Sequence, residues 1–200
     1  AYIDEHGTAS SSRDNTSRER IENVPVKIYH DEDLFVVTNA PQYVDVIVEG
    51  NSGLVQSAKN LRDFEVYIDL TNAKIGDQTV ELKVRGISDK LKVTVDPATV
   101  VVNVQEKVTQ EFSVEAEFSN SLLEEGYTAE QPIIEPSTVK ITGGKDIINS
   151  IAYVRAVVET AGPINETFTH RATITVLDDQ LNKLDVEVEP EKVDVTIPVV

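Results

Sequence analysis

The side chains that usually carry chemistry are present in this sequence, but their spacing indicates no reaction. Cysteine is absent, which excludes a thiol nucleophile, a thiolate metal site and disulfide bonds. The three histidines, His6, His30 and His170, have no partner at a metal-ligand spacing such as H-x-x-x-H, and we expect all three to be exposed. A serine run at residues 10–12 forms no nucleophile elbow, and no phosphate-binding glycine motif occurs. The sequence predicts no catalytic residue and no cofactor.

Carboxylates are so abundant that pairs of them are expected everywhere. Two acidic clusters, at residues 30–33 (His-Asp-Glu-Asp) and 178–182 (Asp-Asp-Gln-Leu-Asn), have side chains that could bind Ca²⁺. The second lacks the D-x-[DN]-x-[DN]-G framework of a calcium loop, and such residues commonly form turns at strand ends. A glycoside hydrolase needs two carboxylates that face each other across a cleft, and no spacing singles out such a pair. We therefore expect no metal site and no enzyme activity.

The charge of the chain disfavours several classes of partner. Lysine and arginine number 18 against 35 aspartates and glutamates, which gives a formal net charge of −17. A field of this sign repels phosphate backbones and anionic lipid headgroups, so we expect no nucleic-acid partner. No run of 18 or more apolar residues occurs, and we expect no membrane span within these residues. The chain has no methionine, even at its first position, which is typical of a fragment of a longer protein.

Four tyrosines remain as candidates for an interaction surface: Tyr43, Tyr67, Tyr127 and Tyr153. Tyrosine combines a large apolar ring with a polar hydroxyl, which suits both partner surfaces and half-buried strand positions. We expect most of the four to be half-buried strand residues. Tryptophan is absent and aromatic residues make up only 6% of the chain, so valine, isoleucine and leucine must fill the interior.

The elements that position these side chains are repeated along the chain. The pattern L-x-V-x-V-[DE]-P-x-x-V-x-V-x-[VI] occurs at residues 91–104 and again at 184–197. A shorter pattern, P-x-x-V-x-[VI], occurs earlier in each half, at residues 41–46 and 136–141. Four occurrences in paired order indicate a duplication. The structural markers of the repeat are Pro41, Pro97, Pro136 and Pro190.

The period of the apolar residues predicts strands. Apolar residues occupy odd positions in residues 91–95 and even positions in residues 100–104, so the phase shifts at Pro97. A straight strand cannot shift phase without turning its core residues outward. Proline lacks the N–H group that a ladder needs, and it holds the preceding residue extended. We therefore expect each marker proline to form a corner between two strands.

Further alternating segments are separated by turn residues, which is typical of strands. They lie at residues 66–70, 80–84, 156–158 and 172–176. Two short segments, 54–58 and 147–151, can each form one helical turn, and the preceding glycines, Gly50 and Gly143-Gly144, suit a positive φ. The predicted fold class is all-β: two tandem small β modules with short helical turns at most.

Three segments follow from these patterns. Residues 1–23 lack apolar periodicity and are expected to form a flexible tether. The first β module is expected at residues 24–106 and the second at 107–200, with Lys107 at the boundary. Modules of this size bury little surface, so we expect modest stability for each.

Several short motifs follow one another in a fixed order within each half. They include Ile-Glu-Asn-Val-Pro-Val at residues 21–26, Ala-Pro-Gln-Tyr-Val-Asp-Val at 40–46 and the segment 68–76. The segment 135–144 belongs to the second half, and a Val-x-Val-x-Pro corner closes each half. In this order the motifs resemble the YbbR domain, which is found in tandem in bacterial extracytoplasmic proteins. The resemblance covers about residues 21–200.

The resemblance implies a function at the outer side of the cell membrane. It points to the cyclase regulators of Gram-positive bacteria, in which one N-terminal membrane helix precedes two to four YbbR domains. The implied partner is the membrane diadenylate cyclase CdaA, which makes cyclic di-AMP and would be reached through a helix before Ala1. Residues 1–3 and the tether are similar to the outer end of such a helix, removed here. The resemblance transfers no catalytic or ligand-binding residue.

Other roles fit the same residues. One alternative is a cell-wall-binding or adhesin-type module with a β-sandwich. A cell-wall component or a second copy of the chain is a further candidate partner under either reading. The full-length protein would separate the two readings, because a single N-terminal span supports the regulator, whereas a long repeat array with a wall-sorting signal supports the adhesin.

Overall fold

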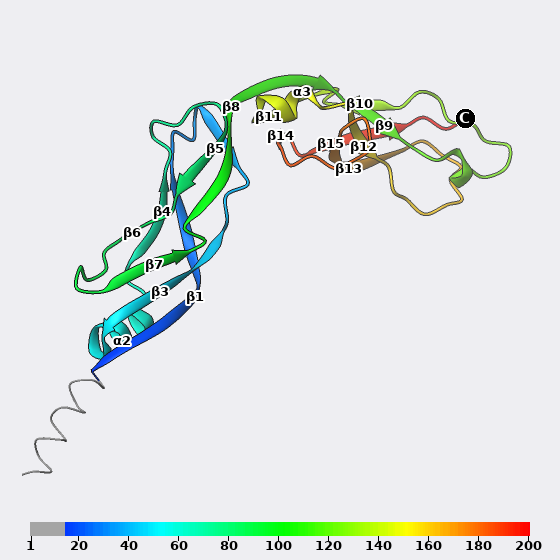
Figure 1. The fold of residues 1–200 in the computed structure, drawn as a ribbon. Coiled ribbons are helices and arrows are strands. Elements are labelled where there is room, and N and C mark those ends of the chain that lie inside the picture. The colour runs from blue at the N-terminus through cyan, green and yellow to red at the C-terminus, as the bar shows by residue number, and fades with distance from the viewer. Residues whose placement is uncertain (1–14) are drawn as a thin grey trace, which may run out of the picture. The chain divides into compact units, whose positions relative to one another are not determined.

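Strands dominate both halves of the chain in the computed structural model, which describes residues 15–200 (Figure 1). Contacts divide the chain into two compact units, the first ending at Val104 and the second beginning at Gln105. Each unit has a hydrophobic core of its own. The described residues form fifteen strands, two α-helices and one 3-10 helix, and the all-β prediction is confirmed.

Unit 1 is built around a five-stranded sheet with the order β6-β4-β1-β3-β7. Its elements are β1 (Thr16–Tyr29), β2 (Phe35–Thr38), β3 (Tyr43–Asn51), α2 (Ser52–Leu61), β4 (Glu65–Asp69), β5 (Gly76–Glu81), β6 (Lys83–Arg85), β7 (Lys92–Asp96) and the first part of β8 (Thr99–Ser113). Strand β1 is antiparallel to β3 and then, at residues 26–29, parallel to β4. The change of partner follows a β-bulge between Ile21 and Val24, where Asn23 has a φ of 56°.

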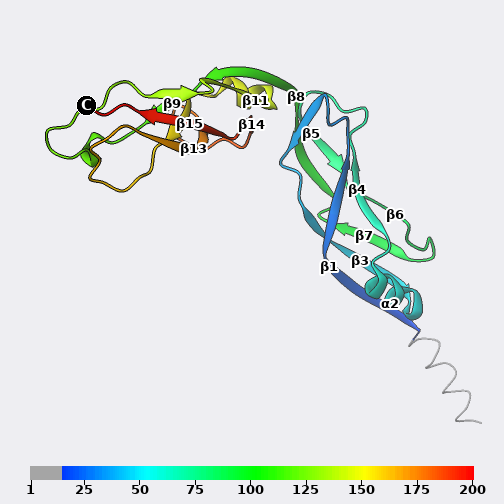
Figure 2. The same cartoon turned by 180° about the vertical axis from the view of Figure 1, so that it is seen from behind.

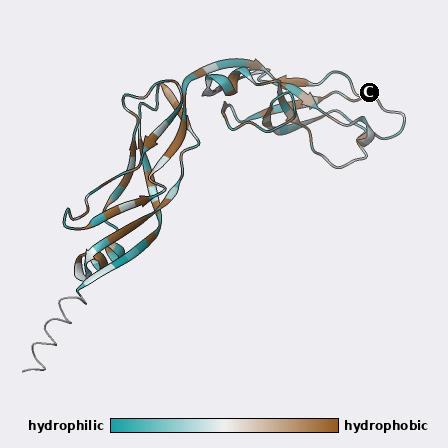
Figure 3. Ribbon diagram, viewed as in Figure 1, coloured by the Kyte–Doolittle hydropathy of each residue, from teal (hydrophilic) through white to brown (hydrophobic). Residues whose placement is uncertain are grey.

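The alternation of apolar and polar residues along the strands decides which face of this sheet is buried. Val44, Val46 and Val48 on β3 are at most 4% exposed, and helix α2 packs against β1 and β3 with Val55 and Ala58 (Figure 2). Burying one such valine contributes about 1.5–3 kcal/mol relative to leaving it exposed. Hydrophobic and hydrophilic positions accordingly alternate along the strands in the hydropathy colouring (Figure 3).

Helix α2 is longer than the single turn predicted from the sequence because both of its ends are capped. The side-chain oxygen of Asn51 accepts hydrogen bonds from the backbone N–H groups of Gly53 and Leu54, at 2.9 and 3.3 Å. At the other end, Arg62 adopts a left-handed conformation and its N–H donates to the Ala58 carbonyl. The caps satisfy backbone groups that a free helix end would leave without partners.

The glycines that precede the two helices have different roles. Gly50 has the predicted positive φ, at 153°, and an added Cβ would lie 2.9 Å from Cδ2 of Leu91. The positive φ predicted for Gly143 and Gly144 is wrong, because both residues continue strand β11 (Thr138–Gly144). Gly143 is needed for close packing instead: an added Cβ would lie 3.1 Å from Cγ1 of Val186.

Unit 2 follows a similar plan. Its elements are the second part of β8, β9 (Glu115–Glu117), η1 (Asn120–Leu122), β10 (Ile133–Glu135), β11, α3 (Lys145–Asn149), β12 (Tyr153–Val157), β13 (Phe168–Leu177), β14 (Glu187–Glu189) and β15 (Lys192–Ile197). One sheet has the order β10-β15-β13-β12-β9, and β14, β11 and β8 form another. Strand β8 runs antiparallel to β11, as the first part of β1 does to β3. Strand β9 runs parallel to β12, as the second part of β1 does to β4. Among residues 15–200, no helix is long and apolar enough to cross a membrane.

Each marker proline lies between consecutive strands. Pro97 separates β7 from β8, and Pro190 separates β14 from β15. The other two, Pro41 and Pro136, stand just before β3 and β11. Apolar residues stay buried on both sides of these corners. Val102, for example, is fully buried although the alternation of apolar residues has shifted by one position at Pro97. The corner allows each strand to keep its own apolar face.

Regular structure begins earlier than the sequence predicts. The expected tether, residues 1–23, overlaps with strand β1 from Thr16 onward, while residues 1–14 lie outside the described part of the chain. This stretch of β1 is hydrophilic, but it pairs with β3, and Arg20 forms an ion pair with Asp45 at 2.8 Å. Ladder bonds and cross-strand ion pairs therefore stabilise a strand that lacks apolar periodicity.

Strand β8 contributes to both units. Its first part pairs with β5 and its second part with β11, and β2 is a further neighbour of β8. Lys107, where the sequence places the module boundary, lies inside this strand. The strand continues because its valines, threonines and phenylalanine suit a half-buried ladder, and no glycine or proline interrupts it.

Candidate functional site

The two described histidines are half-buried rather than exposed. His30 follows the end of β1, and His170 lies on β13 in the other unit. The Nδ1 atom of His30 is buried without a hydrogen-bond partner among the described residues. His6 lies outside them. Across residues 15–200, no group of three histidine, aspartate or glutamate side chains is placed to hold a metal ion.

The acidic cluster around Asp178 is a turn held by its own side chains. The Asp178 carboxylate accepts hydrogen bonds from the backbone N–H groups of Gln180 and Asn182, at 2.9 and 2.8 Å, and from the Asn182 side chain. The Asn182 backbone bond is the main cause that holds the pKa of Asp178 below its usual value. Likewise, Asp31 accepts the Asp33 N–H at 3.0 Å. Both clusters form turns, as these residue types commonly do.

The four tyrosines divide into two pairs. Tyr43 and Tyr127 are 58% and 40% exposed. Tyr67 and Tyr153 are half-buried on strands, so the expectation of half-burial holds for this pair only. Tyr67 belongs to a polar cluster that the sequence alone did not reveal.

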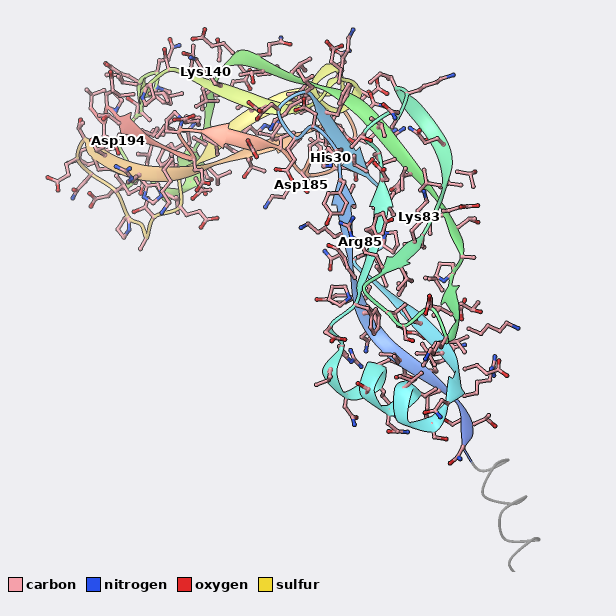
Figure 4. All side chains as sticks on the ribbon, turned by 90° about the vertical axis from the view of Figure 1, so that its left-hand side faces the viewer. His30, Lys83, Arg85, Lys140, Asp185 and Asp194 are labelled. Atoms are coloured by element: carbon pink, nitrogen blue, oxygen red, sulfur yellow. The ribbon has the colours of Figure 1, made fainter. Side chains whose placement is uncertain are left out.

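A cationic and aromatic surface occupies the outer side of strands β1, β4 and β6. We name it the Arg85 face, and its members are Lys27, Tyr29, Glu65, Tyr67, Lys83 and Arg85. They alternate with inward residues such as Val66 and Ile68, which are fully buried. Strand pairing aligns Lys27 with Tyr67, and Tyr67 with Lys83, in one row across three strands. Lys83 and Arg85 are labelled in Figure 4.

The Arg85 guanidinium is held from several sides. Its Nε donates to Oε2 of Glu65 at 2.6 Å, and its Nη2 donates to the Tyr29 hydroxyl. Its central carbon lies 4.4 Å from the ring centroid of Tyr67 and 4.8 Å from that of Tyr29, within cation–π range. The two rings meet edge to face, with centroids 5.8 Å apart. The side chain is thereby fixed although 51% of it remains exposed.

Glu65 is the anion at the centre of this face. Its Oε1 accepts the Tyr29 hydroxyl at 2.7 Å and lies 3.8 Å from Nζ of Lys27. These contacts lower the pKa of Glu65, with the Tyr29 hydrogen bond as the main cause and the Arg85 hydrogen bond next. Glu65 in turn raises the pKa of Arg85. The Glu65 carboxylate is therefore ionised and already in contact with Tyr29, Arg85 and Lys27. The cations of the face are Lys27, Lys83 and Arg85.

Two hollows border the Arg85 face. The first has a volume of about 470 Å³ and contains Lys27 and Glu65 beside apolar residues; it is lined by Val24, Pro25, Val26, Lys27, Arg62, Phe64 and Glu65. The second has a volume of about 220 Å³ and contains Lys83 beside hydroxyl and amide groups; it is lined by Asp69, Leu70, Thr71, Asn72, Ala73, Gln78, Val80 and Lys83. Lys27 and Lys83, the two lysines of the row, therefore each line one of the hollows.

Comparison with known proteins identifies the repeated unit. The family model described as "YbbR-like protein" matches residues 21–104 and again residues 112–197. The chain belongs to the YbbR-like family. Its two matches correspond to the two halves of the sequence repeat, so the chain contains two YbbR modules in tandem.

Relatives of these YbbR modules include a curated protein and two solved structures. The chain is 39% identical, over 185 residues or 92% of its length, to the "CdaA regulatory protein CdaR" of Bacillus subtilis (strain 168), and it spans 38% of that protein. A YbbR-like protein from Streptococcus pneumoniae has the same fold, with a TM-score of 0.61 at 21% identity over 92% of this chain and 96% of that one. A YbbR-like domain from Listeria monocytogenes is 54% identical over 46% of this chain and 96% of its own, with a TM-score of 0.45.

Equivalent residues of the two YbbR modules follow from their backbone hydrogen bonds. The Val26 N–H donates to the Gln42 carbonyl, and the Val114 N–H donates to the Ser137 carbonyl, both at 2.9 Å. Each acceptor directly follows a marker proline, so Val26 corresponds to Val114. The outward residues that come next are Lys27 and Tyr29 in the first module and Glu115 and Glu117 in the second.

Strand pairing extends the correspondence across the sheet. Tyr67 pairs with Lys27, and Arg155 pairs with Glu115, so Arg155 replaces Tyr67. By the same register Tyr153 replaces Glu65, Thr175 replaces Lys83 and Leu177 replaces Arg85. The second module folds with an acidic strand and a leucine where the first has lysine, tyrosine and arginine. The YbbR fold does not itself require the Arg85 face.

The second module has a larger but less organised groove. It has a volume of about 780 Å³ and is lined by Thr109, Lys140, Thr142, Thr173, Ile174, Val186, Glu187, Val188, Glu189 and Glu191. Its glutamates and its lysine are exposed, and none of them is in a side-chain hydrogen bond or ion pair among the described residues. The Arg85 face is therefore the better organised of the two surfaces.

Proposed function

We propose that the chain is a non-catalytic, extracytoplasmic region of a membrane-anchored regulator of the diadenylate cyclase CdaA. The observation that carries the proposal is its 39% identity, over 92% of the chain, to a protein named CdaA regulatory protein CdaR. The proposal places a membrane helix before Ala1, and the modules act on the cyclase through that helix.

The geometry of the modules supports binding rather than catalysis. The Asp178 carboxylate is engaged in its own turn, and Glu65 is engaged by Tyr29 and Arg85. A general base or nucleophile needs a free lone pair beside a site for substrate. Exposed cations lie on the outer side of a sheet, where they suit the recognition of a partner or ligand.

Regulation across a bilayer requires two arrangements whose free energies respond differently to an external change. A ligand outside the cell that binds one arrangement of the modules more tightly would shift the helix, and the cyclase with it. A coupling free energy of about 1–3 kcal/mol is typical of such linkage. The net charge of −17 repels anionic surfaces such as lipid headgroups, so an anionic ligand needs a local cationic site on the modules.

The test co-expresses the cyclase with the full-length regulator or with its membrane helix lacking residues 21–200. Cyclic di-AMP is measured in both strains, with and without wall or osmotic stress. The proposal predicts different basal levels or different responses. Identical levels and identical responses would remove the modules from regulation and leave a scaffold or wall-adhesion role.

A further inference from the structure

We propose that the Arg85 face of the first module binds an acidic polysaccharide. This inference deepens the proposed function, because it names the class of ligand that the modules of such a regulator would sense. Binding is measured on the purified chain without any cyclase. The two ideas can therefore fail separately.

The Arg85 side chain is already oriented for an anion. A guanidinium has five N–H donors in a rigid fork that fits a carboxylate or a phosphate. Glu65 and Tyr29 engage Nε and Nη2, and two rings pack against the plane, while Nη1 makes no hydrogen bond among the described residues. The fork is thus fixed before any ligand arrives, which reduces the entropic cost of binding.

The cations of the face are spaced for an extended ligand. Lys27 and Lys83 lie on either side of Tyr67, two strands apart, so their Cα atoms are separated by about 10 Å. Of the acidic neighbours, Glu65 is held by Tyr29 and Arg85, and Asp69 accepts hydrogen bonds from Thr71. Lys27 and Arg85 share the Glu65 carboxylate, whereas Lys83 stands apart from them, so the face has two positive positions, which suit a chain with repeated anionic groups.

The two hollows have a chemistry that suits sugars. The hollow beside Lys27 has an apolar lining that includes the exposed Pro25, which suits the C–H face of a sugar ring. The hollow beside Lys83 offers amide groups, including that of Asn72, which suit sugar hydroxyls. An acidic polypeptide would use the cations as well, but it carries hydroxyl groups only at occasional serines, threonines and tyrosines, whereas a glycan carries them on every ring. The combination favours a glycan.

The duplication shows that the YbbR fold can form without the Arg85 face. The second module replaces Lys27 and Arg85 with Glu115 and Leu177 and yet keeps the fold. A YbbR module can therefore fold without these residues, although the contacts of Glu65 stabilise this one, and folding alone does not account for an exposed cationic cluster in a chain of net charge −17. We expect the second module to bind no acidic glycan.

The experiment titrates the whole 200-residue chain with polygalacturonate or phosphomannan, which carry carboxylates and phosphates respectively. Dextran serves as a neutral glycan and polyglutamate as an acidic chain without sugars. Calorimetry measures affinity, and ¹H–¹⁵N spectra show which amides respond. We expect at least one acidic glycan to bind, with shifts confined to strands β1, β4 and β6, and binding to weaken as NaCl rises.

The variant Lys83→Thr, Arg85→Leu places the residues of the second module on the first, so it is expected to keep the fold. Removal of each charge-assisted hydrogen bond to the glycan should weaken binding by about tenfold or more. Lys92→Thr removes one exposed strand lysine elsewhere in the first module and should leave affinity unchanged. Thermal unfolding of both variants checks that the fold is retained.

Several results would overturn the inference. Failure of both acidic glycans to bind would end it, and so would equal affinity of the double variant and the wild type. Equal or tighter binding of polyglutamate would assign the face to an acidic protein partner. Equal binding of dextran would show that the cations have no role.

Discussion

Individual carboxylates on the surface of both modules are tied to nearby donors. The pKa values of four of them are lowered, and in each case a hydrogen bond is the main cause. The carboxylate and its main donor are Asp45 with Arg20, Glu65 with Tyr29, Asp69 with the Thr71 N–H, and Asp178 with the Asn182 N–H. A carboxyl whose pKa is depressed by folding stabilises the folded state above its unfolded pKa. That contribution is lost as the pH falls through the folded value.

Acid should remove the stabilising contribution of Glu65. The pKa of Glu65 is lowered from 4.5, so its contribution should be complete at pH 7 and should fade as the pH falls below about 4.5. Glu65→Gln should therefore destabilise the chain more at pH 7 than at pH 3, measured by urea unfolding. Glu81→Gln, at another exposed strand position, serves as the control. An effect of Glu65→Gln that is the same at both pH values would contradict this assignment.

A second residue-scale prediction separates packing from backbone conformation. Gly50→Ala would place a Cβ 2.9 Å from the Leu91 side chain at a φ of 153°, whereas Gly76→Ala has a φ of 110° but no atom within 4 Å. Both substitutions incur backbone strain, of about 1–3 kcal/mol. Only Gly50→Ala adds a steric clash, so its loss of unfolding free energy should be the larger. Equal losses would show that Leu91 moves aside without cost.

At the scale of elements, the sequence predicted the strands that have apolar alternation and the corners that have proline. It did not predict the first part of β1, because residues 16–20 are polar and are held by pairing with β3. It also did not predict the Arg85 face. Lys27 and Tyr67 come together through a parallel pairing between distant segments, which tertiary packing rather than a turn decides, and Lys83 joins them through an antiparallel pairing. The polar positions of the alternating segments were the only signal.

The cap of helix α2 gives an element-scale prediction. Asn51→Ala removes the acceptor for two backbone N–H groups and should lower the free energy of unfolding by about 0.5–2 kcal/mol. Asn60→Ala, near the other end of the same helix, removes an exposed amide and should be neutral or slightly stabilising. Chemical denaturation measures both. The interpretation is wrong if Asn60→Ala proves the more damaging of the two.

At the scale of the whole molecule, the chain has two separate hydrophobic cores made mainly of valine and isoleucine. Ile68 lies in the first core and Ile141 in the second, and both are fully buried. The duplication provided two copies of one fold, and their outer faces then diverged in charge. In our account the cores hold the modules in shape, and the first module presents the ligand-binding face.

The two cores lead to a prediction about local stability. Ile68→Ala and Ile141→Ala should each cost about 2–5 kcal/mol. Hydrogen exchange should show protection lost mainly in the module that carries the substitution. Uniform loss of protection throughout residues 15–200 in both variants would show that the modules unfold as one unit.

Regulation of a diadenylate cyclase by these YbbR modules is tested most directly by the cyclic di-AMP concentration in cells. The cells contain the cyclase and a full-length regulator, with residues 21–200 either intact or deleted. A third strain carries Ile68→Ala and Ile141→Ala together, and immunoblots verify equal amounts of membrane-bound regulator. We predict that deletion and core disruption change cyclic di-AMP, or its response to stress, in the same direction. Unchanged levels and responses in both altered strains would contradict a regulatory role.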